Sequence, residues 1–136
     1  MLPALLLPAL VWAAPGIDEG TFAFTKARLA AVKSGDVDRI LALYDPWAEA
    51  VGSDGRLAKG SDALRARWAG LLAKGPLQVE LKEISYMAGP DGVFAHAVIA
   101  LTAPGEAPVL QHVTEYRVRK QGRWLLRYES FQRAQG

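Results

Sequence analysis

The sequence predicts an α+β domain in which three helices precede a curved, mostly antiparallel sheet. Two patterns support this fold class. Apolar residues recur at helical spacing in the first half of the chain, whereas apolar and polar residues alternate in four successive segments after Pro76. Helices followed by strands are typical of helices packed on one face of a sheet, and the 136 residues allow one such domain.

The first expected helix covers residues 21–34. Phe22, Leu29 and Val32 fall near helical spacing, and Gly35 follows where a left-handed cap would end the helix. A second, short helix begins after the N-cap residue Asp36 and ends before Pro46. Its apolar positions are Val37, Ile40, Leu41 and Tyr44.

A short strand is expected at residues 47–51, followed by a turn at residues 53–55. The segment Gly60–Asp62 then begins a third helix, which Gly75–Pro76 ends. The apolar face of this helix consists of Leu64, Trp68, Leu71 and Leu72.

The second half of the chain predicts four strands in a meander, each separated from the next by a Gly- or Pro-containing turn. The apolar phase shifts within the first of them, which predicts a β-bulge near Lys82–Glu83. The expected strands are residues 77–86, 93–102, 109–120 and 123–131.

The N-terminal segment, residues 1–14, contains no charged residue and is rich in leucine and alanine. It predicts either a signal peptide or an apolar arm packed on the domain. Signal peptides have such an apolar region before small residues, whereas a spanning helix needs about 20 residues. We therefore expect a periplasmic or secreted protein with no stable membrane insertion, whose folded domain covers residues 18–132.

Composition excludes several kinds of site. The chain has no cysteine, so it has no disulfide, no thiolate nucleophile and no cysteine-type zinc site. Its net charge of +2 gives no reason to expect nucleic-acid binding. The basic residues of the last hairpin form either cross-strand ion pairs on a solvated face or an anion site. They are Arg117, Arg119, Lys120, Arg123 and Arg127.

The phrase from Ser34 to Asp45 (SGDVDRILALYD), an Asp-Gly turn, a helix led by Gly60 and a final Gly122-Arg123-Trp124 hairpin resemble the nuclear transport factor 2 (NTF2)-like superfamily. The SnoaL-like and DUF4440-type bacterial domains are closest in pattern. The resemblance covers about residues 20–132. It implies a cone-like fold with a pocket between the helices and the concave sheet, often a homodimer, and no fixed function.

Strand alternation predicts which residues line such a pocket. On residues 109–120, one face carries His112 and Tyr116 and the other carries Glu115 and Arg117, and we expect the first face to point inward. Tyr128 belongs to the matching face of the last strand. His112 and Tyr116 could form an acid–base pair, or they could be hydrogen-bonded core residues.

The strand around His96 is apolar on both faces, so both faces are expected to be covered. One face would be the pocket wall with His96 as a ligand-binding residue. The other would be a sheet-to-sheet contact in the homodimer that the resemblance implies. A metal on His96 and His112 is not expected, because alternation points Glu115 away from His112.

In isomerases of the NTF2-like superfamily, which this chain resembles, a carboxylate base lies just after the second helix. By this resemblance the base position falls near Gly52 here. Glu49 could replace this base as a catalytic residue, or it could be a surface carboxylate. Tyr44 and Trp47 are expected at the rim of the pocket as ligand-binding residues, although helical spacing also allows Tyr44 to be core.

These patterns leave three functions open, none of which calls for a cofactor. The first is an exported domain that binds a small apolar or aromatic molecule, or serves as an accessory module, without a clear catalytic set. The second is a SnoaL-like isomerase, cyclase or dehydratase that uses acid–base catalysis on a carbonyl substrate. The third is an adaptor whose sheet binds another protein.

Overall fold

The computed structural model describes residues 17–134, and its regular elements run from Glu19 to Arg133. The helices are α2 (Glu19–Ser34), α3 (Val37–Leu41) and α4 (Ser61–Leu71). The strands are β1 (Tyr44–Val51), β2 (Leu57–Lys59), β3 (Gln78–Ala88), β4 (Gly92–Thr102), β5 (Val109–Lys120) and β6 (Arg123–Arg133). The predicted segment 1–14 lies outside the described residues.

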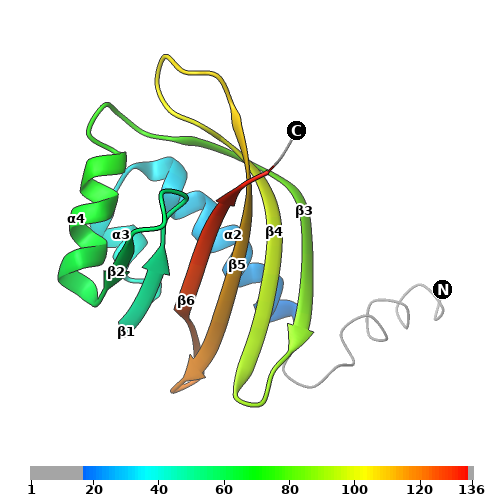
Figure 1. The fold of residues 1–136 in the computed structure, drawn as a ribbon. Coiled ribbons are helices and arrows are strands. Elements are labelled where there is room, and N and C mark those ends of the chain that lie inside the picture. Colours follow the sequence, from blue (N-terminus) through cyan, green and yellow to red (C-terminus); the bar gives the residue numbers. More distant parts are fainter. Residues whose placement is uncertain (1–16, 135–136) are drawn as a thin grey trace.

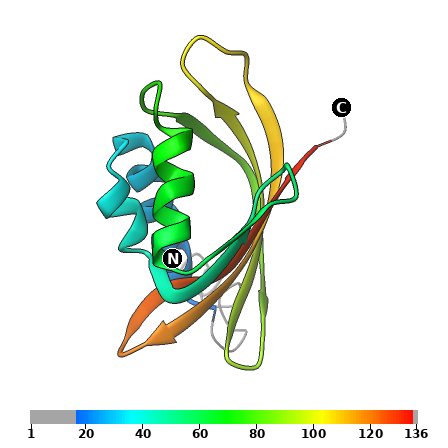
Figure 2. The ribbon, with the colours of Figure 1, turned by 60° about the vertical axis from the view of Figure 1, so that its left-hand side comes forward.

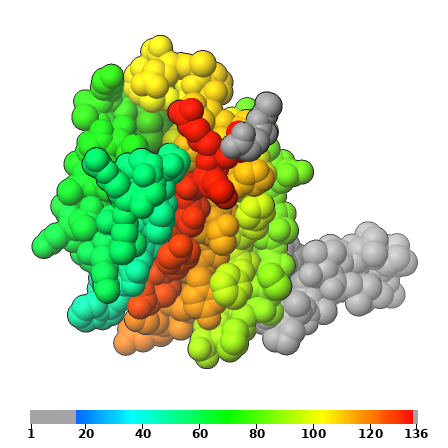
Figure 3. Space-filling model, viewed as in Figure 1, coloured from blue at the N-terminus to red at the C-terminus, as the bar shows by residue number. Residues whose placement is uncertain are grey.

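The strands form one sheet in the order β2-β1-β6-β5-β4-β3 (Figure 1). β1 runs parallel to β6, and every other neighbouring pair is antiparallel. The sheet curves around the helices, which all lie on its concave side (Figure 2). No helix covers its outer face in the described part of the chain (Figure 3). The predicted α+β class is confirmed.

Local signals explain where α2 begins and ends. Asp18 is the N-cap, and its carboxylate accepts a hydrogen bond from the backbone N–H of Thr21, whose side chain bonds back to Asp18. This capping box starts the helix before the predicted Thr21. Gly35 ends it with φ +72°, the left-handed conformation that glycine adopts without steric cost.

Tyr44 was predicted at the end of a helix, and this is wrong. α3 stops at Leu41, and β1 begins at Tyr44, because the chain pairs with β6 there: the N–H of Leu126 donates to the carbonyl of Leu43 at 2.8 Å. Pro46 is tolerated within β1 because the β1–β6 register shifts between Tyr44 and Glu49, where no ladder donor is needed.

The four strands predicted after Pro76 are confirmed in position. The sheet that they form also contains β1 and β2, which precede Pro76. β3 carries the predicted bulge, since its register with β4 shifts between Leu81 and Glu83. β2 was not predicted, because its three residues are too few for alternation to be visible. β2 and the parallel β1 extend the sheet to six strands on the side where α4 packs.

The hydrophobic core lies between the helices and the concave face of the sheet. Ile40, Leu64 and Leu126 are almost fully buried there. Among the helices of residues 17–134, none combines the length and the apolar character that crossing a membrane requires.

Candidate functional site

A cavity of about 400 Å³ lies between the helices and the concave face of the sheet. Its walls are mostly apolar, and five of its lining residues (Ser53, Asp54, Ala66, Gly70 and Leu71) are exposed and form a rim. Such a volume lies within the range of pockets that hold small molecules, roughly 300–1,000 Å³. The apolar walls include Leu29, Val32, Trp68, Val79, Ile99, Val113 and Phe131.

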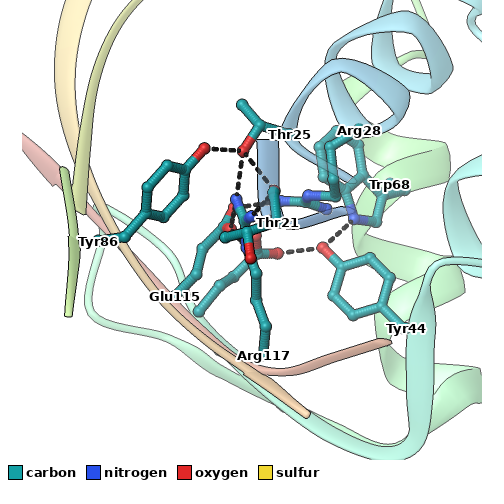
Figure 4. Close-up of polar contacts among 9 residues, drawn as sticks. Thr21, Thr25, Arg28, Tyr44, Trp68, Tyr86, Glu115 and Arg117 are labelled. Atoms are coloured by element: carbon teal, nitrogen blue, oxygen red, sulfur yellow. Dashed lines mark hydrogen bonds and ion pairs between the residues drawn. The ribbon is translucent and has the colours of Figure 1, made fainter. Parts of the chain in front are cut away.

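Four buried charged residues form the polar end of this cavity, and we call them the charged cluster: Arg28, Glu115, Arg117 and Glu129. Arg28 from α2 reaches both glutamates through Nη2, with 3.3 Å to Oε2 of Glu115 and a shorter contact to Glu129 (Figure 4). Arg117 donates from Nε to Oε1 of Glu115 at 2.8 Å. Two guanidinium groups therefore balance two carboxylates away from water.

Arg117 ties this cluster to α2. Its Nη1 donates to the backbone carbonyl of Thr21 and its Nη2 donates to Oγ1 of Thr25, both at 2.8 Å. Thr25 shares a further hydrogen bond of 2.8 Å with the hydroxyl of Tyr86. The guanidinium also lies over the ring of Phe24, with its central carbon 5.0 Å from the centroid. The partners of Arg117 fix it as a structural group.

Glu129 is held from the other side by Tyr44. The Tyr44 hydroxyl donates to Oε1 of Glu129 and accepts a hydrogen bond of 3.0 Å from Nε1 of Trp68 (Figure 4). Each side chain comes from a different element: β6, β1 and α4. Tyr44, predicted at the rim of the pocket, therefore lies behind the charged cluster, where it positions Glu129.

The two glutamates have opposite pKa shifts. Burial raises the pKa of Glu115, but the guanidinium groups of Arg28 and Arg117 outweigh burial and bring it below its usual value. Burial raises the pKa of Glu129 as well, Arg28 opposes it only in part, and the carboxylate of Glu115 adds to the rise. Glu129 is thus the carboxyl of the cavity that more readily holds a proton.

The inward face predicted for β5 is wrong. Gln111, Val113, Glu115 and Arg117 face the cavity, whereas the face that carries Leu110, His112 and Tyr116 lies on the outside of the sheet. The alternation is confirmed, but its phase departs from the general rule that charged residues face water. Here the charges neutralise one another inside, so that rule does not apply.

A second β-bulge changes the phase of β6. Tyr116 pairs with Tyr128 and the next residue, Arg117, pairs with Leu126, which leaves Arg127 as an extra residue. As a result Leu126 and Glu129, three positions apart, are both buried on the inner side, and Tyr128 points outward. The prediction that Tyr128 faces inward is therefore wrong.

The predicted pocket residues on β4 and β5 come together on the outer face instead. The rings of His96 and His112 stack with centroids 5.3 Å apart, and Phe94 packs against Tyr116 at 4.7 Å. None of these four side chains lines the cavity. Phe94 is 41% exposed in the single chain, and the predicted sheet-to-sheet contact over this face of β4 stays a prediction.

Glu49 and Trp47 also lie away from the cavity. Glu49 alternates with the buried Ala48 and Ala50, so it shares the outer face of the sheet with Tyr128, its register partner on β6. Trp47 is 71% exposed. Gly52, where the resemblance places a base, does line the cavity and brings no carboxylate.

Sequence reasoning missed Arg28, Glu115, Arg117 and Glu129 as site residues. The phase of β5 has no clear local signal: Val113 lies on the same face as Glu115 and Arg117, but a single apolar residue among polar ones also occurs on solvated faces. Three of the five basic residues named on the last hairpin form ion pairs, none of them across the hairpin, and Arg117 forms its pair in the interior with Glu115 of its own strand. Arg119 and Lys120 bind Asp18 and Asp45.

Comparison with known proteins gives the same architecture. The family model of the SnoaL-like domain matches residues 25–126. The chain belongs to the SnoaL-like family. No curated protein matches this SnoaL-like domain.

Solved structures agree with the predicted NTF2-like fold. An NTF2-like protein of unknown function from Pseudomonas putida superposes with a TM-score of 0.74 and 21% identity over 82% of each chain. A Streptomyces avermitilis protein of the NTF2-like family, named as a proposed dehydratase, has a TM-score of 0.78 and 15% identity over 87% of this chain and 96% of that one. At these identities the likeness shows the fold alone.

Proposed function

We propose that this SnoaL-like domain binds a small, mainly apolar molecule in the cavity between α2, α4 and the concave sheet. The observation that carries the proposal is the cavity itself, a space of about 400 Å³ with apolar walls and a charged cluster at its buried end. Apolar walls favour the body of a ligand, and a few placed polar groups orient it.

Filling the cavity is expected to abolish this binding. Ala97 lies on β4 and lines the cavity, so Ala97→Phe places a ring where the ligand lies. We expect the affinity for a neutral apolar dye such as Nile red, measured by fluorescence titration, to fall at least about tenfold. The loss follows from displaced volume, because the change removes no polar contact.

The matched control is Ala100→Phe, the same substitution on the same strand. Ala100 does not line this cavity, and alternation places it on the outer face. We expect its dye affinity to equal that of the unmodified protein. Equal affinity of the Ala97→Phe protein, confirmed as folded by circular dichroism, contradicts the proposal.

A second function, acid–base catalysis on a carbonyl substrate, is favoured by Glu129. This carboxyl lines the cavity, and burial raises its pKa toward the range useful for proton transfer. In such a reaction the Glu129 carboxylate would take a proton from the carbon beside the carbonyl, and Arg28 would stabilise the negative oxygen that forms.

Hydrogen–deuterium exchange tests this second function without knowledge of the natural substrate. We expect the protein to speed exchange at the methyl group of 2-acetylnaphthalene in D₂O, followed by proton NMR, and Glu129→Gln to slow it at least about tenfold. Glu106→Gln, a change of an exposed glutamate, is the control. Equal exchange rates with Glu129→Gln and the unmodified protein contradict a catalytic role for Glu129.

A further inference from the structure

One buried polar side chain in the cavity has no partner within the protein. Gln111 is only 9% exposed, faces inward from β5 and lines the cavity. No hydrogen bond joins its side-chain amide to any of residues 17–134. The other buried polar side chains of these residues each have at least one hydrogen bond: Thr21, Thr25, Arg28, Asp45, Glu115, Arg117 and Glu129.

An amide in this position is unusual for structural reasons alone. Buried polar groups are generally hydrogen-bonded, and an apolar residue of similar size would fill the same wall without desolvating an amide. The neighbours of Gln111 on this face are the apolar Val113 and Ile99 and, on β6, the exposed Arg133, which forms no hydrogen bond with the amide. The amide lines the cavity, where water or a ligand that enters the cavity can hydrogen-bond to it.

Gln111 and two members of the charged cluster, Glu115 and Arg117, lie at different positions along β5. Gln111 and Glu115 are four positions apart, which corresponds to about 13 Å along β5. Val113 lies between them on the same face, and Ile99 and Phe131 continue the apolar wall. The cavity therefore offers two polar positions joined by an apolar stretch.

We infer that Gln111 is a ligand-binding residue whose amide hydrogen-bonds to a hydroxyl or carbonyl oxygen at one end of an elongated, apolar ligand. The inference rests on the proposed binding function and specifies its ligand class. An amide both donates and accepts, so it suits an uncharged oxygen group of either kind. The opposite end of the ligand lies toward the charged cluster.

Matched ligands and one substitution test the role of Gln111. Biphenyl and 4-hydroxybiphenyl differ only in a terminal hydroxyl, and their affinities are measured by isothermal titration calorimetry. We expect the unmodified protein to prefer 4-hydroxybiphenyl about fivefold, as one additional hydrogen bond provides. Gln111→Leu should remove the preference and retain the binding of biphenyl.

Gln132→Leu is the control, since Gln132 is exposed on the neighbouring strand and does not line the cavity. It should keep the preference. The side-chain NH₂ signal of Gln111 in ¹⁵N NMR provides a readout in the unmodified protein, and it should shift with 4-hydroxybiphenyl far more than with biphenyl.

The outcomes separate this inference from the proposed function. Binding of both ligands with the same preference in Gln111→Leu overturns the role of Gln111, whose amide then holds only water, while the binding function stands. No binding of either ligand by the unmodified protein overturns both proposals. An unmoved Gln111 signal in the presence of bound 4-hydroxybiphenyl overturns the inference without any variant.

Discussion

Replacing Arg117 by methionine is expected to lower the free energy of unfolding by about 3–5 kcal/mol, the cost of breaking a buried ion pair by removing one partner. Arg117 is 1% exposed and donates to Glu115, to the carbonyl of Thr21 and to Thr25. Methionine fills a similar volume but donates nothing, so Glu115 keeps only Arg28 and the acceptors on α2 lose their donor.

Urea unfolding followed by circular dichroism measures the effect. Arg119→Met is the matched control, because Arg119 lies two residues further along β5 and pairs with Asp18 at an exposed site. It should cost less than about 1 kcal/mol. Equal losses in the two variants would show that the charged cluster does not stabilise the fold through Arg117.

Much of the fold was predictable because local sequence patterns determine it. The starts of α3 and α4, the bulge in β3 and the bounds of β5 follow from caps, alternation and turn residues. The position of Tyr44 at the start of β1 was not predictable in this way. Its spacing fits a helix, and only the long-range pairing of β1 with β6 places it in a strand.

The site was predicted less well, for one physical reason. Alternation states which residues share a face, but not which face is inside. On β5 the polar set is buried because Arg117 and Arg28 neutralise Glu115 and Glu129, and Arg28 comes from a helix about ninety positions away in the chain. No local pattern shows that these charges meet.

Two predictions concern surfaces outside the cavity. The outer face of the sheet carries exposed apolar side chains, among them Met87 at 66% and Leu110 at 46%. The predicted homodimer through this face stays a prediction, as does export, since residues 1–14 lie outside the described part of the chain. The stacked pair His96 and His112 belongs to this face and not to the cavity.

Replacing Glu115 by glutamine is expected to cost about 3 kcal/mol at neutral pH, and this cost should depend on pH. The pKa of Glu115 in the folded protein lies below its usual value of 4.5, because Arg28 and Arg117 outweigh the effect of burial. Below 4.5 the unfolded chain binds more protons at this site than the folded protein does, so the stabilisation by the carboxylate is lost as pH falls through the folded pKa.

The difference in unfolding free energy between the unmodified protein and Glu115→Gln should therefore be complete at about pH 7 and shrink toward about pH 3. Urea unfolding at several pH values measures it, with Glu83→Gln as the exposed control. Glu129 acts in the opposite sense, because its raised pKa costs stability as pH rises. Because the Glu115 carboxylate contributes to that rise, the difference between the two proteins reports on Glu115 together with its coupling to Glu129. A difference that stays constant from acid to neutral pH would mean that the ionised carboxylate of Glu115 is not what holds Arg28 and Arg117 in place.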